Sequence, residues 1–247
     1  MAGRMEITLF LILAALLIGI SKGGLGGPVP GSMAAPILTL VMPAADAMGI
    51  VLPMLLFADL LALRLYWRKW SHHYLRLLLP AATVGIISGT LVLLIMPDAS
   101  LRRVIGGFTL LMIAYKLIGD KANAWNYRPR AWHGSLAGWG SAFGAALANS
   151  GAAPFTAYML LQPDMQPRMF VGTATLFFFL INALKVPGYL GGGVLQFDRI
   201  WPIAWVFFLI PVGFSIGYLG LKRINAQLFE GLLLILLALL GLILLSS

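Results

Sequence analysis

Long apolar runs separated by short polar segments are the feature that most limits how this chain can fold. Several of these runs approach or exceed the roughly 20 residues that a helix needs to cross a lipid bilayer. Only 10% of the residues are charged, whereas soluble domains average about 25%, so the chain cannot build a surface suited to water. We expect an all-α, polytopic membrane protein, because a transmembrane barrel would require short alternating strands that the sequence lacks. The apolar units are 6–42, 47–67, 74–96, 101–119, 132–162, 168–186, 200–219 and 226–245.

The charged and reactive residues exclude several functional classes. The formal net charge is +9, but the basic residues lie at the ends of the apolar units, where membrane topology rather than nucleic-acid binding places them. The chain contains no cysteine, which excludes disulfides, thiolate metal sites and a catalytic thiol. No pair of acids and no serine–histidine set has a spacing that supports hydrolysis. We expect no enzyme activity, no cofactor, no metal and no nucleic-acid partner.

The two halves of the chain resemble each other. Four pairs of segments recur in the same order: SMAAP (32–36) with SGAAP (150–154), Pro43 with Pro163, GIISG (85–89) with GFSIG (213–217), and IGGFTLLMIA (105–114) with FEGLLLILLA (229–238). This order predicts two repeats of four helical units each, at 1–119 and 131–247, joined by a polar linker loop at 120–130. Repeated halves are typical of secondary transporters. In GIISG and GFSIG we expect the small residues to allow close helix packing.

Each half begins with an apolar unit that is broken by helix-disrupting residues. The first break is SKGGLGGPVPG (21–31) and the second is ALANSGAAP (146–154). Non-helical backbone at membrane depth is tolerated only where protein or a water-filled cavity surrounds it. Matching breaks in two halves therefore indicate a transporter binding site, at which the N-termini of half-helices present N–H groups and positive dipole ends to an anion. We expect an interrupted or re-entrant helix at the start of each repeat.

Three ionisable residues within apolar units are candidates for function. Lys22 lies at the first break, where it either binds an anion or extends to the membrane interface. Lys185 lies near the end of the sixth unit and allows the same two interpretations. Asp59 is the one acid well inside an apolar run. It either couples transport to a proton or sodium ion or forms a structural ion pair with Arg64 or a lysine, although Arg64 lies on another side of the same helix.

Three segments resemble the sulfite exporter TauE/SafE family of bacterial membrane transporters. They are GISKGGLGG (19–27), ADLLALRLYWRKW (58–70) and FVGTATLFFFLINALKVPGY (170–189). The resemblance implies transport of small anions, typically sulfite or organosulfonates, across the inner membrane. It places the family's site positions on Ser21, Lys22, Gly23, Gly24, Asn182 and Lys185.

The chain departs from the family pattern at two places. Many relatives carry a histidine where this chain has Asn149, and asparagine cannot take up a proton, which puts proton coupling through that position in doubt. The run GGPVPG (26–31) is less rich in glycine than is usual there, which would reshape the pocket.

We therefore expect a secondary transporter in the bacterial inner membrane that moves small anions by alternating access, the alternative being a passive anion channel. Lys22 and Lys185 would supply positive charge at a site between the two broken units. Asp59 would carry the coupling proton or sodium ion. The expected partners are a small anionic substrate and the lipid bilayer, and the oligomeric state stays open. The remaining expected contacts are backbone N–H groups near Gly23, Gly24 and Gly151 and the side chains of Ser21, Asn149, Ser150 and Asn182.

The lengths of the broken units predict a topology. At 1.5 Å per residue, residues 6–20 span about 22 Å and residues 32–42 about 16 Å, and neither crosses roughly 30 Å of hydrocarbon. If units 6–42 and 132–162 are both re-entrant hairpins, each half crosses the membrane three times and both termini are periplasmic. If these units instead cross fully, the C-terminus is cytoplasmic.

Overall fold

The computed structural model describes residues 2–24, 28–122, 130–220 and 225–246. These residues form helices and contain no strand, and six of the helical segments are long and apolar enough to cross a membrane. The expectation of an all-α membrane protein is therefore confirmed. The helices are α1 (Ala2–Gly23), α2 (Val29–Ser32), α3 (Ala34–Leu38), α4 (Ala44–Leu65), α5 (His72–Ile95), α6 (Asp98–Ala122), α7 (Ala131–Ala148), α8 (Ala152–Leu160), α9 (Pro167–Gly191), α10 (Phe197–Ile200), the 3₁₀-helix η2 (Trp201–Phe208), α11 (Leu209–Gly220) and α12 (Ala226–Ser246).

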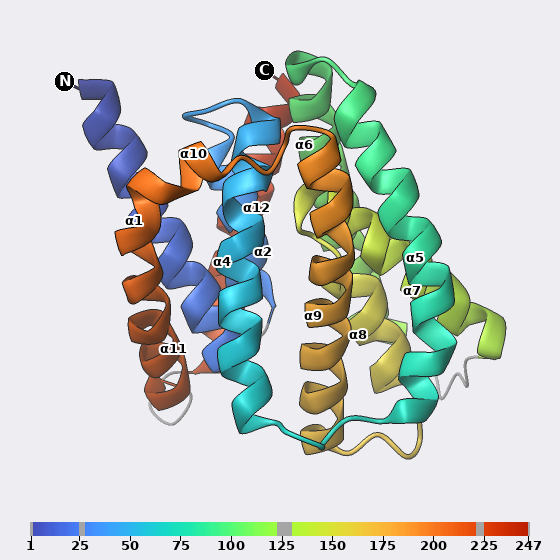
Figure 1. Cartoon of the computed structure of the whole chain (residues 1–247). Coiled ribbons are helices and arrows are strands. Elements are labelled where there is room, and N and C mark those ends of the chain that lie inside the picture. The colour runs from blue at the N-terminus through green and yellow to red at the C-terminus, as the bar shows by residue number, and fades with distance from the viewer. Residues whose placement is uncertain (1, 25–27, 123–129, 221–224, 247) are drawn as a thin grey trace.

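The first part of the chain turns back inside the bundle (Figure 1). Helix α1 runs downward from the N-terminus at the upper end, α2 and α3 return upward, and α4 runs down again. Helix α1 is longer than its sequence suggests, because it continues through Lys22 to Gly23. Gly24 follows with a φ of 103°, a left-handed conformation that glycine adopts without steric cost. The break therefore begins at Gly24, three residues later than expected.

A second hairpin opens toward the opposite end of the bundle (Figure 1). Helix α7 rises from the lower end, α8 descends again, and α9 then runs upward. Asn149 ends α7 with a left-handed φ of 51°, which asparagine tolerates better than most residues. The N–H of Ser150 donates to the carbonyl of Gly144 at 3.1 Å and closes this helix end. The tips of the two hairpins thus meet inside the protein from opposite sides.

Small residues allow the helices of one half to pack on the hairpin of the other half. On α5, a Cβ added at Gly89 would lie 2.8 Å from the carbonyl oxygen of Phe143 on α7. On α11, a Cβ added at Gly213 would lie 2.5 Å from the carbonyl oxygen of Leu16 on α1. The expected close packing of the segments 85–89 and 213–217 is confirmed.

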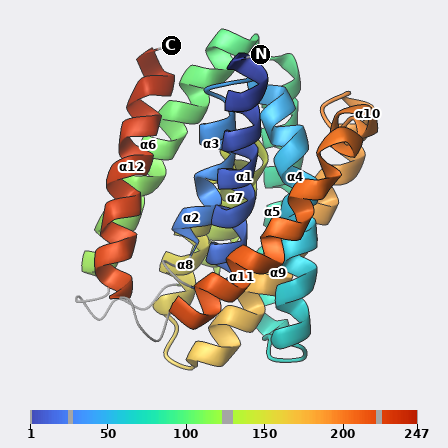
Figure 2. The same cartoon turned by 90° about the vertical axis from the view of Figure 1, so that its left-hand side faces the viewer.

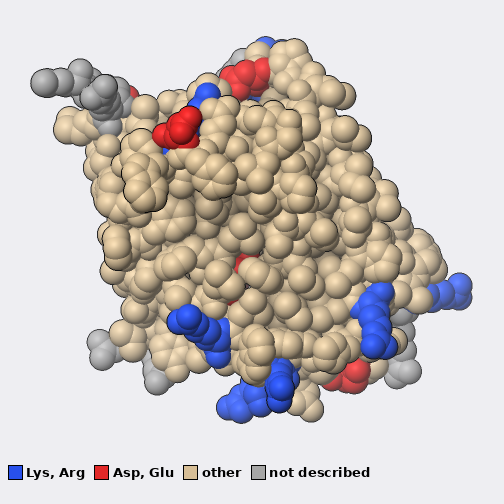
Figure 3. Space-filling model, viewed as in Figure 1, with Lys and Arg blue, Asp and Glu red and all other residues tan. Residues whose placement is uncertain are grey.

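Charged side chains gather mainly toward the two ends of the molecule, and the broad band between them shows only a small acidic spot (Figure 3). In the view of Figure 3, Lys and Arg are concentrated at the lower end. Exposed apolar side chains also occur on α12, for example Leu232, Ile235 and Leu239. Exposed leucine and isoleucine on this scale are suited to contact with lipid tails rather than with water.

Candidate anion-binding site

Lys22 and Asp59 form an ion pair between the end of α1 and the middle of α4. The Lys22 Nζ lies 2.5 Å from the Asp59 Oδ1. The Asp59 side chain is fully buried, whereas the Lys22 side chain keeps 18% of its exposure. The Lys22 ammonium also lies 5.6 Å from the ring centre of Phe178 on α9, within the range of a cation–π contact. Of the alternatives considered for Asp59, this geometry matches a pair with a lysine, and that lysine is the one at the first break.

Asn182 on α9 connects this ion pair to the second half of the chain. Its Nδ2 donates to the Asp59 Oδ2 at 2.8 Å. Asn182 is 4% exposed, so the hydrogen bond is shielded from solvent. The Asp59 carboxylate therefore has a partner on each oxygen, as a buried carboxylate requires.

Lys185 lies one helical turn beyond Asn182 and is almost completely buried. Its side chain retains 1% of its exposure, so Lys185 lies inside the bundle rather than at a membrane interface. The Nζ donates to the carbonyl oxygen of Ala145 at 2.8 Å and to the Asn149 Oδ1 at 3.0 Å. Lys185 thus holds the end of α7 at the point where the second hairpin turns.

A small pocket of about 60 Å³ lies between the two hairpin tips. Helices α1, α2, α4, α7, α8 and α9 all contribute to its wall. The pocket is lined by Ser21, Lys22, Pro28, Gly31, Ser32, Leu55, Ala145, Asn149, Ala152, Phe178 and Asn182. Four predicted site residues, Ser21, Lys22, Asn149 and Asn182, are therefore brought together. Lys185 lies behind Asn149 and reaches the pocket through that side chain.

The other predicted site residues lie beside this pocket. Gly23 faces α11, where an added Cβ would lie 2.8 Å from the backbone nitrogen of Tyr218. The Gly24 N–H donates to the carbonyls of Ile20 and Ser21, each at 3.1 Å. Gly151 packs against Ser141 and Ala145 on α7. These three glycines shape the helix ends, and the Gly24 N–H is already used within the protein, which differs from the expected role.

Ser150 and seven lining residues that were not predicted complete the surroundings. Ser150 is buried and lines a larger neighbouring cavity instead of the small pocket. Ser32, Leu55 and Phe178 line the small pocket but were not predicted. Ser32 belongs to the repeated SMAAP segment, which was a usable signal, whereas Leu55 and Phe178 are indistinguishable in sequence from the apolar residues around them.

Comparison with known protein families shows to which family the chain belongs. The model of the sulfite exporter TauE/SafE family matches residues 11–244, nearly the whole chain. The chain belongs to the sulfite exporter TauE/SafE family. Comparisons with curated proteins and with solved structures gave no match. As a TauE/SafE protein, the chain is a multi-pass membrane transporter of sulfur anions and not an enzyme.

Proposed function

We propose that this TauE/SafE protein binds its anion in the small pocket between the hairpin tips. The observation that carries the proposal is the charge balance around the pocket. The partly buried Lys22 pairs with the carboxylate of Asp59, whereas the buried Lys185 donates, among the described residues, to the neutral groups of Ala145 and Asn149. One positive charge is left without a counter-charge among the described residues of the site. Burying such a charge is costly, and a bound anion would compensate it.

The contacts of the bound anion follow from the donors around the pocket. The Lys22 ammonium is partly exposed to it and can bind a substrate oxygen. The amides of Asn149 and Asn182 provide further donors, and the hydroxyls of Ser21 and Ser32 lie in the same wall. Sulfite and an organic sulfonate offer the same three-oxygen face to these groups, so both are candidates for the substrate.

We further propose that Asp59 couples anion transport to a proton or a sodium ion. Asp59 and the substrate compete for the same ammonium of Lys22, because an approaching anion draws that ammonium away from the carboxylate. A carboxylate that loses its counter-ion in a buried place binds a cation more tightly. Anion binding and cation binding at Asp59 therefore favour each other, which is the thermodynamic condition for coupling.

The helix arrangement supports inverted repeats and alternating access. Helix α5 packs on α7 of the other half, and α11 packs on α1 in the corresponding way. One hairpin opens upward and the other downward (Figure 1). We assign the lower end to the cytoplasm of a bacterial inner membrane, because Lys and Arg gather there (Figure 3) and cytoplasmic loops carry an excess of these residues. Both termini are then periplasmic.

Transport by purified protein in proteoliposomes tests the proposed function. Labelled sulfite should accumulate against its own gradient when a proton or sodium gradient is imposed. Sulfate, sulfoacetate, taurine and simple carboxylates should be compared as competitors. Equilibration without accumulation under every gradient would indicate a passive anion channel, and absence of flux and of binding for all these anions would contradict the proposal.

A further inference from the structure

A cavity of about 520 Å³ extends from the small pocket toward the lower end of the bundle. It lies between α2, α6, α8 and α12, and its wall includes Lys116 and Glu230 near the lower ends of α6 and α12. The same wall shares Pro28, Ser32 and Ala152 with the small pocket. Figure 2 shows α6 and α12 side by side, on one flank of the short helices α2 and α8. The cavity thus adjoins the proposed anion site and reaches the lower ends of α6 and α12.

The lining of this cavity is suited to water. The Thr109 hydroxyl lines the cavity, is buried, and has no hydrogen-bond partner among the described residues. A buried hydroxyl without a partner is costly unless water or a ligand meets it. Lys116 and Glu230 form an ion pair of 3.0 Å in the cavity wall near its lower end, where both charged groups keep contact with solvent. The cavity therefore carries polar groups, Thr109, Lys116 and Glu230 among them, within a wall that is otherwise largely apolar.

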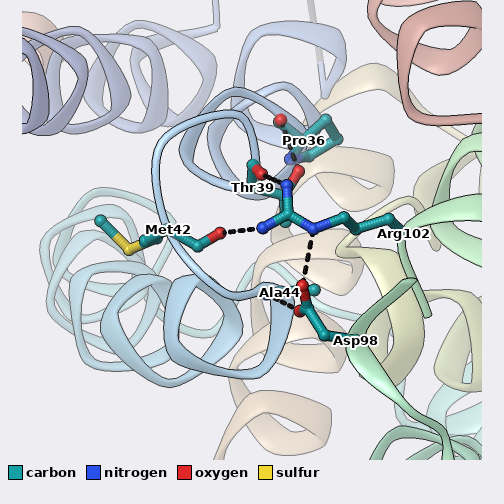
Figure 4. A network of polar contacts seen from close by, with 6 residues as sticks. All are labelled: Pro36, Thr39, Met42, Ala44, Asp98 and Arg102. Atoms are coloured by element: carbon teal, nitrogen blue, oxygen red, sulfur yellow. Dashed lines mark hydrogen bonds and ion pairs between the residues drawn. The ribbon is translucent and has the colours of Figure 1, made fainter. Parts of the chain in front are cut away.

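A polar network around Arg102, near the start of α6, surrounds the turn between α3 and α4 (Figure 4). The guanidinium donates to the carbonyl oxygen of Thr39 and, at 2.9 Å, to that of Met42. These carbonyls follow the end of α3 and have no further helical turn to pair with. Asp98 accepts from the Arg102 Nε at 2.7 Å and from the N–H of Ala44, at the start of α4, also at 2.7 Å. The Asp98–Arg102 ion pair lies within α6, and its hydrogen bonds to Thr39, Met42 and Ala44 tie the turn between α3 and α4 to this helix.

An apolar contact lies below this network. Val29, Met33 and Ile37 of the first hairpin pack with Leu233 and Leu237 of α12. On the other side of the site, α8 faces α12 across the large cavity. The first hairpin therefore packs on α12 through α2 and α3, whereas the second hairpin packs on α6 through α7 and α8 and is separated from α12 by the cavity.

Each of the two turns that follow the hairpins is attached to a neighbouring segment. Asp46, just after the upper turn, pairs with Arg199 before η2, and Asp164 in the lower turn accepts from Tyr74 on α5. These two attachments correspond to each other if the halves are inverted repeats. The upper turn is also attached to Asp98 and Arg102, which lie on α6. The segment 221–224 before α12, where the second half would hold the residue that corresponds to Asp98, lies outside the described residues.

We propose that this structure is the inward-open form of the transporter and that the Asp98–Arg102 network is its outer gate. This inference rests on the proposed function, since it assigns a route to the proposed anion site. In the outward-open form, Arg102 releases the carbonyls of Thr39 and Met42, and the first hairpin separates from α6 and α12. The second hairpin then closes on α12 and fills the lower cavity. Arg102 and Asp98 thereby set the balance between the two forms without touching the substrate.

Thiol labelling can follow both sides of the site, because the chain has no cysteine of its own. Ala157→Cys places a reporter in the lower cavity, and Ile37→Cys places one in the apolar contact below the outer gate. In the otherwise unchanged protein, a membrane-impermeant maleimide should label Ala157→Cys from the cytoplasmic side, and Ile37→Cys should stay protected from the periplasmic side. Adding Arg102→Ala should raise the periplasmic labelling rate of Ile37→Cys about tenfold or more, because the equilibrium shifts toward the outward-open form. It should lower the cytoplasmic labelling of Ala157→Cys.

Two further variants and one control variant keep this test decisive. Arg102→Lys retains the charge but cannot contact both carbonyls and Asp98 at once, so it should shift labelling in the same direction. It replaces Arg102→Ala in the test if Arg102→Ala does not fold. Asp98→Ala should also shift labelling, whereas Asp198→Ala, an exposed aspartate in α10, should not. Unchanged labelling of both reporters in folded Arg102 and Asp98 variants would show a static attachment and overturn the proposal. If labelling shifts but no anion is transported, the gate stands and the proposed function fails.

Discussion

Lys22 and Asp59 are bound to each other across the first break, with 2.5 Å between the ammonium and the carboxylate. The lysine lies in the last turn of α1, and the aspartate lies within α4. A change at the hairpin tip is therefore transmitted directly to α4. Because the two residues form a pair, we expect that substituting only one of them lowers both the stability of the protein and its transport activity.

Lys22→Ala should nearly abolish anion transport and should also destabilise the protein. The variant removes the cation that pairs with the buried Asp59 carboxylate among the described residues, a change that typically costs about 3–5 kcal/mol. The double variant Lys22→Ala/Asp59→Asn should recover thermal stability without recovering transport, measured as melting temperature in detergent and sulfite flux in proteoliposomes. Lys22→Arg should restore transport poorly, because a planar fork replaces a compact charge. Normal flux in Lys22→Ala would exclude the proposed site.

Asp59→Asn should uncouple anion movement from the ion gradient while leaving anion exchange intact. Asparagine still accepts the hydrogen bond from Asn182 but carries no charge and cannot take up a proton. Gradient-driven accumulation and exchange at equal concentrations should be measured on the same preparation. Asp198→Asn is the matched control and should accumulate anion like the unchanged protein. Accumulation that persists in Asp59→Asn would contradict the coupling role.

Asn149→Asp should weaken anion binding about tenfold or more and raise the melting temperature. A carboxylate next to Lys185 supplies the counter-charge that we assign to the substrate, so the variant is stabilised without ligand and the anion meets a neutral site. Calorimetric titration with sulfite and thermal melting check the two effects. Asn225→Asp, at the exposed start of α12, should change neither. Unaltered sulfite affinity in Asn149→Asp would argue against the charge balance as the basis of binding.

Gly89→Val should prevent normal folding. Its Cβ would lie 2.8 Å from the Phe143 carbonyl oxygen and 2.9 Å from the Ala146 Cβ, so α5 and α7 would have to separate along their contact. The fraction of monodisperse protein in detergent measures the effect. Gly231→Ala on α12, where nothing lies within 4 Å of an added Cβ, should be tolerated. Equal yields from both variants would contradict the close contact.

A reporter protein fused after Ser247 tests the topology. A fluorescent protein that folds only in the cytoplasm should stay dark there, whereas a phosphatase that requires the periplasm should be active. The same fluorescent protein inserted in the loop between α4 and α5 should be bright. A bright signal after Ser247 would place the C-terminus in the cytoplasm and contradict the proposed inverted arrangement.

The sequence was sufficient for the fold class and for part of the site. Long apolar runs predict membrane helices because the bilayer fixes the length that a span needs. Glycine, proline and asparagine at the breaks indicate where the helices end, and this placed Lys22 and Asn149 near the same pocket. The pairing of Lys22 with Asp59 could not be predicted, because it depends on how α1 is placed against α4 in space.

Arg102 illustrates a second kind of gap. An arginine at the end of an apolar unit is expected from membrane topology alone, so the sequence gives no reason to assign Arg102 a more specific role. Its partners are backbone carbonyls of Thr39 and Met42, which carry no signature in the side-chain sequence. The large cavity was likewise unpredictable, since it results from the distance between α8 and α12 rather than from any single motif.

The glycine contacts of α5 with α7 have a consequence for biosynthesis. The ribosome delivers α5 to the membrane before α7 is synthesised, so the face of α5 that carries Gly85 and Gly89 stays unpacked until α7 is inserted. During that interval, insertion factors or lipids have to cover the groove. Helix α1 waits even longer, because α11 is among the last segments to be synthesised. Neither half can therefore reach its final packing while translation is incomplete, and we expect the assembled transporter to mature as a single unit only after the chain is released.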